Sequence, residues 1–431
     1  MNEPHNAVMA SSNYRSQRKP AQDNKPSEQG KRRTFLGYLA LMGPAFVVGA
    51  WQFGPGNLTT AVQAGSRYGY TLLWVIAVST ILMIFFTDMS VRLGLATPKS
   101  LITEIKERLG KPVGVAAGIG VFGITLMFSV GNAVGSGLGL SMVFGGSPVL
   151  WTIVCTAGVG LILAFRNVYG IIEKILLLIV ALMAVAFIAS AVIAKPDWYL
   201  SMTGLVPTLP AGSEILVIAL VGTNFSINAA FYNSYGIKEN SRTRSDYRDI
   251  TLVDTIPGII APGIMTALVI MVSASVLGAT GSEASTINGL AAIFEPLAGP
   301  FGTIIFALGL SGAAFSSMIA NATAGGTMMS DALGRGSKGG SPMARVITGI
   351  ILAFGLLVTL TFQESPVGLI VVAQSLTVLI APLLGILLVM MANNKEIMGD
   401  LRNRWWHNVF GIIGLVAILA SSIRLVSALI S

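Results

Sequence analysis

Long apolar runs recur along the chain and predict helices that cross a membrane. Each run holds about 20 residues with few charges, the length that spans the hydrocarbon layer of a bilayer. The runs are continuous and lack the polar–apolar alternation of a membrane β-barrel. This pattern predicts an all-α polytopic membrane protein of about 11 helices. We place the spans at residues 36–63, 70–94, 113–143, 148–165, 169–194, 213–237, 251–278, 298–330, 344–362, 367–391 and 407–429.

Composition agrees with the membrane class. The 431 residues are 53% hydrophobic and only 11% charged, whereas a soluble globular protein carries roughly 25% charged residues. A single cysteine, Cys155, excludes a disulfide framework and a cysteine-based metal site. Nothing in the composition favours an enzyme, and we expect no cofactor.

The N-terminal segment, residues 1–34, differs from the rest of the chain. It is polar, carries seven of the 27 Lys and Arg residues and has no apolar core of a signal peptide. We predict a disordered basic cytoplasmic tail that attracts anionic membrane lipids and does not bind nucleic acid. Residues 35–431 are then one transmembrane domain, which we expect to be monomeric.

Basic residues are distributed unevenly between the predicted loops. With the N-terminus inside, only Arg67, Lys195 and Arg424 fall on the outer side of the membrane. Cytoplasmic loops are enriched in Lys and Arg, so this bias sets the orientation. We therefore predict a multi-pass protein of the cell membrane with a cytoplasmic N-terminus, an external C-terminus and an odd number of spans.

The spans divide into two halves of five helices, followed by an eleventh. Because five is odd, the second half enters the membrane upside down relative to the first. Inverted repeats of this kind are typical of secondary transporters, which bind their substrate near the middle of the membrane. The repeat is inferred from topology alone, since no residue-level repeat is evident between the halves.

The first span contains Gly54-Pro55-Gly56-Asn57 near its middle. Pro55 removes a backbone N–H group, and the two glycines weaken the helix around it. At this depth, unpaired backbone groups are tolerated only where they line a cavity or bind something. We predict a broken helix that forms a substrate site; the alternative is a structural kink filled by a neighbouring helix.

The corresponding helix of the second half carries Asn224, Ser226 and Asn228 but no proline. Asn224 and Asn228 are four residues apart and are expected to share a helix face. The three side chains either complete the substrate site or hydrogen-bond neighbouring helices, as polar residues in membranes often do. Helix 10 adds Gln374 near its apolar middle as a further substrate-binding candidate.

Few acidic residues lie within the spans. Asp88 precedes Arg92 by four residues, which predicts a local ion pair. Asp254 lies early in helix 7 and Asp331 ends helix 8. None lies at the centre of helix 1, 3 or 6, which argues against a carboxylate proton relay through the site.

A series of segments follows one order and spacing along the chain. They are Gly43-Pro44-Ala45-Phe46, Gly54-Pro55-Gly56-Asn57-Leu58-Thr59-Thr60, Gln63-Ala64-Gly65-Ser66-Arg67-Tyr68-Gly69-Tyr70, Leu73-Trp74, Arg92-Leu93-Gly94-Leu95-Ala96-Thr97, Ser316-Ser317, Gln374 and Met398-Gly399-Asp400-Leu401-Arg402-Asn403. This series resembles the NRAMP divalent-metal transporters over roughly residues 36–430. The resemblance implies the LeuT-like fold, two inverted five-helix repeats plus an eleventh helix.

The chain departs from the family's pattern at the positions that matter most. The family's helix 1 motif is Asp-Pro-Gly-Asn, and Gly54 stands at the aspartate. Its helix 6 motif, Met-Pro-His, aligns with Ser226, Ile227 and Asn228, so the soft thioether ligand and the helix-breaking proline are both replaced. Of the family's two helix 10 glutamines, one position holds Ile380.

The resemblance implies transport of a divalent metal cation, and these departures modify that expectation. Mn²⁺ and Fe²⁺ exchange their hydration shell for ligands that usually include negative charge, but Asn57 and Ser226 are neutral. We expect Asn57 and Ser226 to be ligands for a weakly selective or Mg²⁺-like ion. Ser129 and Asn132 stand where proton-coupled members carry an Asp and a Glu, so classical proton-coupled Mn²⁺ or Fe²⁺ uptake is not expected.

Two other functions stay open. Amino-acid carriers of the LeuT-like fold bind a substrate carboxylate at a glycine-rich break in helix 1, using helix N-termini. Without the aspartate, the break at Gly54 suits a small organic anion or amino acid as well. The second alternative is a transport-inactive scaffold or sensor, although the soluble tail is short and featureless.

Overall fold

Every element that the computed structural model describes is helical. The described residues are 41, 43–164, 181, 184–278, 287–294, 299, 301–363 and 365–430. The predicted tail (residues 1–34) and most of the fifth predicted span (169–194) lie outside them. The first half contains α2 (Pro44–Gln52), α3 (Pro55–Tyr68), α4 (Leu73–Ala96), α5 (Leu101–Leu109), α6 (Lys111–Phe144) and α7 (Pro148–Ala164).

The second half begins after the short helix α9 (Trp198–Thr203). It contains α10 (Glu214–Asn224), α11 (Ile227–Glu239), η1 (Arg244–Asp246), α12 (Tyr247–Ile250), the π-helical segment η2 (Thr251–Thr255), α13 (Ile256–Val276), α14 (Ile287–Ala291), η4 (Ala292–Phe294), α16 (Phe301–Ala332), α17 (Pro342–Thr361), α18 (Pro366–Leu376), η5 (Thr377–Leu379) and α19 (Ala381–Asn393). The last elements are α20 (Lys395–Met398), η6 (Gly399–Leu401) and α21 (Trp405–Ile430).

Seven helical stretches in the described residues are long and apolar enough to cross a membrane. The bent pair of α18–η5 with α19 makes an eighth. The first predicted span is divided between α2 and α3, and the fourth is α7, with 17 residues. The fifth predicted span is thus the one without a matching full-length helix, because most of its residues lie outside the described ones.

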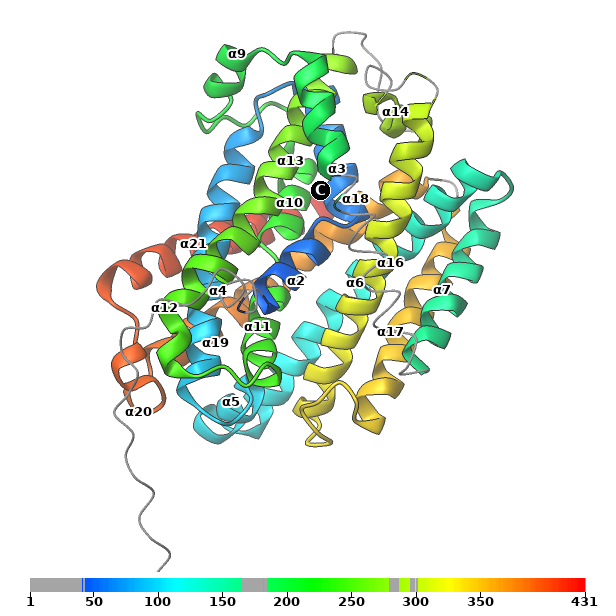
Figure 1. Cartoon of the computed structure of the whole chain (residues 1–431). Coiled ribbons are helices and arrows are strands. Elements are labelled where there is room, and N and C mark those ends of the chain that lie inside the picture. The colour runs from blue at the N-terminus through cyan, green and yellow to red at the C-terminus, as the bar shows by residue number, and fades with distance from the viewer. Residues whose placement is uncertain are drawn as a thin grey trace, which may run out of the picture.

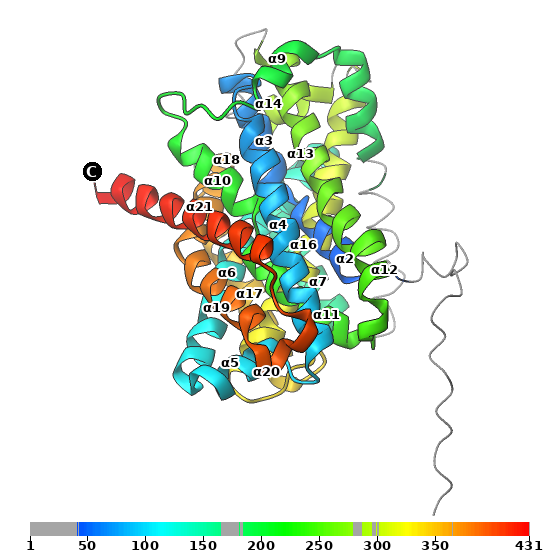
Figure 2. The same cartoon turned by 90° about the vertical axis from the view of Figure 1, so that its left-hand side faces the viewer.

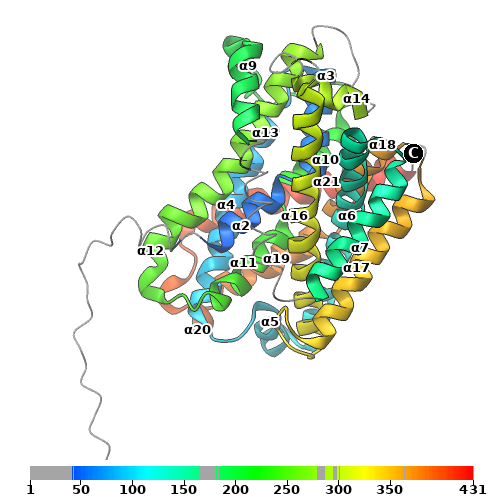
Figure 3. The same cartoon turned by 45° about the vertical axis from the view of Figure 1, so that its right-hand side comes forward.

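Small residues bring the long helices close together. α6 and α16 pack along their length, and α7 and α17 lie beside them (Figure 3). A Cβ added to Gly139 of α6 would come within 2.2 Å of Ser311 Oγ on α16. In a bilayer, where lipid is as apolar as the helices, such close packing drives association. The many glycines therefore allow the helices to pack closely against one another.

The first helix is broken, as predicted, at the centre of the molecule. α2 packs against α11, α13 and α16 (Figure 1). It ends at Gln52, and α3 begins at Pro55, whose fixed φ and missing N–H suit the first turn of a helix. Gly54 between them is extended, with φ −88° and ψ −177°.

Two further interruptions carry weaker sequence signals. Phe225 and Ser226 separate α10 from α11 without a proline. A bend of 42° separates α18–η5 from α19, although the sequence pattern indicated one continuous span over 367–391. Pro382 in the first turn of α19 accounts for this bend, because its ring removes a hydrogen bond and clashes with the preceding turn.

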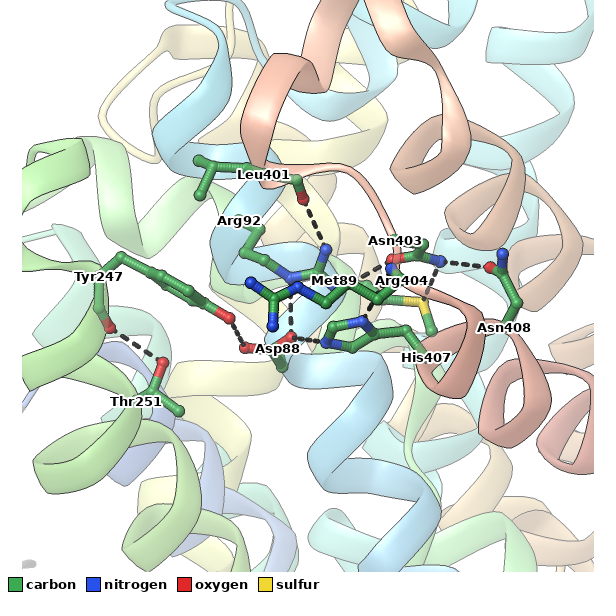
Figure 4. Close-up of polar contacts among 10 residues, drawn as sticks. All are labelled: Asp88, Met89, Arg92, Tyr247, Thr251, Leu401, Asn403, Arg404, His407 and Asn408. Atoms are coloured by element: carbon green, nitrogen blue, oxygen red, sulfur yellow. Dashed lines mark hydrogen bonds and ion pairs between the residues drawn. The ribbon is translucent and has the colours of Figure 1, made fainter.

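A buried ion pair within α4 contacts the start of α21 and the segment that leads into it (Figure 4). The predicted pair of Asp88 and Arg92 is confirmed, with Nε 2.8 Å from the carboxylate. Asp88 also accepts a hydrogen bond of 2.9 Å from the hydroxyl of Tyr247 and lies 3.5 Å from His407 Nε2. Arg92 donates to the Leu401 carbonyl. From this anchor, α21 crosses α4 and extends away from the bundle (Figure 2).

Candidate functional site

A small polar cavity lies where the two broken helices meet α6 and α18. Its volume is about 10 Å³. Four of its polar or glycine residues belong to the break of helix 1. Its other polar residues belong to α6, to α18, and to α10 with the residues that follow it. The lining residues are Trp51, Gln52, Gly54, Gly56, Asn57, Phe128, Asn132, Thr223, Ser226 and Gln374.

Glycines make the cavity narrow because they let neighbouring groups approach the backbone. A Cβ at Gly54 would come 2.7 Å from Ser317 Oγ on α16. A Cβ at Gly56 would come 2.4 Å from Gln374 Nε2. Real Cβ atoms do not approach so closely, so no larger residue fits at either position without movement of its neighbour. Packing therefore requires glycine at both positions of the break.

Asn57 lies on the first turn of α3 and is buried. Its Oδ1 is 2.9 Å from the hydroxyl of Thr266 on α13. Its Nδ2 has no hydrogen-bond partner among the described residues. An unpaired buried amide group is destabilising unless something binds it.

Gln374 of α18 is the second buried amide with an unpaired atom in the lining. Its Oε1 has no hydrogen-bond partner in the part of the chain that the structure describes. Only about 1% of the residue's surface is exposed. Two residues of the lining thus each carry a buried amide atom that a polar occupant could satisfy.

Ser226 joins this cavity to a second one of similar size. That cavity, about 10 Å³, is lined by residues that include Asn228 of α11 and Thr377 of η5. Ser226 donates a hydrogen bond of 2.7 Å to Asn228 Oδ1. Ser226 therefore lies at the break of helix 1, whereas Asn228 lines only the second cavity and contacts the first through Ser226.

Asn224 and Pro55 do not face the first cavity. The side chain of Asn224 donates to Ile76 and Thr80 on α4, at 3.3 and 3.0 Å. The predicted shared face of Asn224 and Asn228 is wrong, because the helix is interrupted between them. Pro55 packs against Gly135 of α6, where an added Cβ would come within 2.4 Å of its ring.

Two polar residues beside the breaks were not among the predicted site residues. Gln52, the last residue of α2, donates from Nε2 to the carbonyl of Asn224 at 3.2 Å and thereby links the two breaks. Thr266 on α13 is the partner of Asn57. A signal existed for Gln52, since it is a polar residue two positions before Gly54 in an apolar span.

The site is neutral. No group of three or more His, Cys, Asp or Glu residues that could hold a metal ion occurs in the described residues. Ser129 donates to the Ile351 carbonyl at 2.7 Å, and Asn132 lines the cavity. The cavity can therefore offer amide, hydroxyl and backbone dipoles to a substrate, but no titrating group from its described lining.

The fold defines the class of protein. The chain superposes on the manganese transporter of Eremococcus coleocola in complex with an aromatic bis-isothiourea compound, with a TM-score of 0.75, 18% identity and coverage of 91% of this chain and 87% of that chain. It also superposes on MhsT in complex with L-phenylalanine, with a TM-score of 0.56, 16% identity and coverage of 88% and 98%. The chain is thus an all-helical polytopic membrane protein with the LeuT-like fold, as predicted.

The sequence identifies the family. The family described as natural resistance-associated macrophage protein-like (Nramp) matches residues 45–428. The divalent metal cation transporter MntH of Bacillus subtilis is 28% identical over 409 residues, which are 92% of this chain and 94% of that protein. MntH of Deinococcus radiodurans is 26% identical over 394 residues, covering 89% and 88%. This chain belongs to the Nramp family, a family of transporters and not of enzymes, so the resemblance seen in the sequence is confirmed.

Proposed function

We propose that this protein transports a divalent metal cation with weak selectivity and favours a hard ion such as Mg²⁺ over Mn²⁺. The ligand set of the cavity carries the proposal. Asn57 and Gln374 each offer a buried amide atom without a partner, and Ser226 adds a hydroxyl. Neutral oxygens are ligands of hard cations. The relatives' names as divalent metal cation transporters point the same way.

The amide of Asn57 can present its oxygen to the cavity. Thr266 has one hydroxyl hydrogen, and the carbonyl of Pro262, which only accepts, lies 2.7 Å from that hydroxyl. When the hydrogen goes to Pro262, Asn57 satisfies Thr266 by donating from Nδ2. Amide oxygen and nitrogen exchange places by a simple flip, which turns Oδ1 of Asn57 toward the position without a partner. Both unpaired amide atoms are then oxygens.

Neutral ligands predict weak binding and a partly hydrated ion. A bare divalent charge in a buried site without a compensating anion is costly, so the ion keeps some of its water. Mg²⁺ loses water reluctantly and is commonly bound in this way. Without a thioether, the site also lacks the soft ligand that distinguishes Mn²⁺ from Mg²⁺.

The size of the cavity favours an ion over an organic solute. Its volume of about 10 Å³ is close to the space of one water molecule. An amino acid would require a much larger opening. A small organic anion is nevertheless the second candidate, because α3 and α11 begin at the breaks and neither N-terminus has a side-chain cap.

The topology and the oligomeric state belong to the same proposal. We place the N-terminus in the cytoplasm and the C-terminus outside, because of the distribution of Lys and Arg between the loops. We expect the transporting unit to be a monomer. Reporter fusions at the two ends test the orientation, and a cytoplasmic C-terminus would contradict it.

Proteoliposomes loaded with a metal-sensing dye test the function. Wild-type protein should move Mg²⁺ at least as fast as Mn²⁺, while Asn57→Ala and Gln374→Ala should each lower the initial rate about tenfold, the effect of one lost interaction of about 1.4 kcal/mol. Asn233→Ala is the matched control. Asn233 is also fully buried and also leaves its Oδ1 unpaired among the described residues, but it does not line the cavity. Binding of a small amino acid by wild-type protein that moves no metal would favour the organic carrier.

A further inference from the structure

Three side chains and one backbone carbonyl form a continuous line of hydrogen bonds that ends at Ser226. Ser226 Oγ donates to Asn228 Oδ1 at 2.7 Å. Asn228 Nδ2 donates to Asn321 Oδ1 at 3.4 Å, and Asn321 Nδ2 donates to the carbonyl of Thr125 at 3.1 Å. All four residues are buried. The line connects the packed pair of α6 and α16 to the break between α10 and α11.

The far end of the line fixes its direction. The Thr125 carbonyl can only accept, so Asn321 must turn its N–H group toward it. Oδ1 of Asn321 then faces Asn228, which must donate a hydrogen bond from its own Nδ2. Oδ1 of Asn228 consequently faces Ser226, and Ser226 must donate. Each amide orientation follows from the one before it, so none is a free choice of the kind that makes amide flips ambiguous.

The direction decides what Ser226 offers to the cavity. A hydroxyl has one hydrogen and two lone pairs. Because its hydrogen is committed to Asn228, only lone pairs remain for an occupant. Lone pairs bind a cation and repel a carboxylate. The orientation of Ser226 thus separates the two substrate classes that the neutral composition of the site leaves open.

We propose that Asn321 is a positioning residue that sets cation specificity by fixing the orientation of the Ser226 hydroxyl through Asn228. This inference rests on the proposed transport of a divalent cation. Asn321 does not touch the substrate cavity at the break of helix 1. Its contribution is directional: it makes a neutral residue act as an acceptor, which partly offsets the lack of an anionic ligand.

Two substitutions at residue 321 separate orientation from packing. Asn321→Asp loses the bond to Thr125 but still accepts from Asn228, so Ser226 remains a donor. Asn321→Leu has similar volume and removes both bonds, so Asn228 is free to flip and Ser226 to rotate. Both variants should lose thermal stability. Only Asn321→Leu should raise the KM for Mg²⁺ or Mn²⁺, by about tenfold, a size usual for coupled contacting residues.

A double-mutant cycle with Ser226→Ala tests whether Asn321 acts through Ser226. The double variant Ser226→Ala/Asn321→Leu should have the same KM as Ser226→Ala alone. Equal KM values for Asn321→Asp and Asn321→Leu, or fully additive effects in the cycle, would overturn the inference. The inference would then fail while the proposed function stands, provided that wild-type protein transports the cation and Asn57→Ala transports it more slowly. If the proposed function itself fails, wild-type protein moves no divalent cation at all.

Discussion

The carboxamide of Gln374 lies directly against Gly56, so that a Cβ at residue 56 would come within 2.4 Å of both its Cδ and its Nε2. On another side, a Cβ at Gly131 of α6 would come within 2.8 Å of the same nitrogen. The amide is held between two backbones that have no side chain. The position of this amide therefore depends on the absence of a side chain at both glycines.

Gly56→Ala should displace Gln374 from the cavity. The added methyl group cannot share space with the amide, and the flexible Gln374 side chain is the group that can move. We expect initial rates of divalent-cation uptake to fall about tenfold, as in Gln374→Ala, because one oxygen ligand is lost. The double variant Gly56→Ala/Gln374→Ala should be no slower than either single one. Gly158→Ala on α7 is the control, since no described atom outside its own helix backbone and its chain neighbours lies within 4 Å of its Cβ position.

The break in helix 1 was predictable because its cause is local. Pro55 and its flanking glycines disfavour a continuous helix in any surroundings. The interruption after Asn224 has no such signal, since Phe225 and Ser226 fit within a helix. It depends on partners far away in the sequence, including Gln52, whose side chain binds the carbonyl of Asn224. Contacts of this kind cannot be read from one segment of sequence.

The direction of each polar side chain was the least predictable feature. Asn224 and Asn228 share a face only if the helix between them is intact, and the interruption turns Asn224 toward α4. In contrast, the local pair of Asp88 and Arg92 was predicted correctly, because a spacing of four residues within a regular helix fixes their proximity. Pro382 offered a local signal for the bend before α19 that the apolar pattern concealed.

Restoring a carboxylate at residue 54 should require a second change. A Cβ at Gly54 would come 2.7 Å from Ser317 Oγ, so Gly54→Asp alone crowds α16. Ser317→Ala removes the obstructing hydroxyl. We expect the double variant Gly54→Asp/Ser317→Ala to bind Mn²⁺ more tightly than wild-type protein by at least about tenfold, because the anion neutralises part of the ion's charge. Calorimetry with purified protein measures this.

The single variants provide the controls for that experiment. Ser317→Ala alone should bind no more Mn²⁺ than wild-type protein, and it should lose some stability because Ser317 donates to the Trp51 carbonyl at 2.9 Å. Gly54→Asp alone should be less stable than the double variant. A double variant that binds no metal would argue against the cavity as a cation site.

Breaking the buried pair of Asp88 and Arg92 should destabilise the protein strongly. Arg92 is 2% exposed and holds the Leu401 carbonyl and the amide of Asn403 in addition to Asp88. Removing one member of a buried ion pair leaves an uncompensated charge and costs about 3–5 kcal/mol. Asp88→Asn should therefore lower the midpoint of thermal unfolding in detergent markedly. The double variant Asp88→Asn/Arg92→Gln should recover part of that loss; no recovery would mean that the pair is not the source of the effect.

Asp254 should stabilise the start of α2. Its carboxylate accepts hydrogen bonds of 2.8 and 3.2 Å from the backbone amides of Gly43 and Ala45. These amides belong to the positive end of the helix, where a negative charge is favourable. Asp254→Ala should cost about 1 kcal/mol, the usual effect of losing a helix cap. Asp254→Asn keeps one accepting oxygen, so its midpoint of thermal unfolding should lie between those of wild-type protein and Asp254→Ala. Equal stability of all three would contradict this assignment.

Metal uptake should move no protons in a fixed ratio. The described lining of the cavity contains no titratable side chain, and its residue Asn132 is an amide. Ser129 lies outside the lining and donates a hydrogen bond of 2.7 Å to the Ile351 carbonyl. Proteoliposomes that carry both a pH dye and a metal dye should report metal entry without matching acidification.

Asn132→Asp places a carboxyl group in the cavity. That group is charged and attracts the cation above its pKa, and it becomes neutral as the pH falls, so the variant should transport faster at high pH than at low pH while wild-type rates change little. Acidification in step with metal entry by wild-type protein would show that a proton pathway exists elsewhere in the chain.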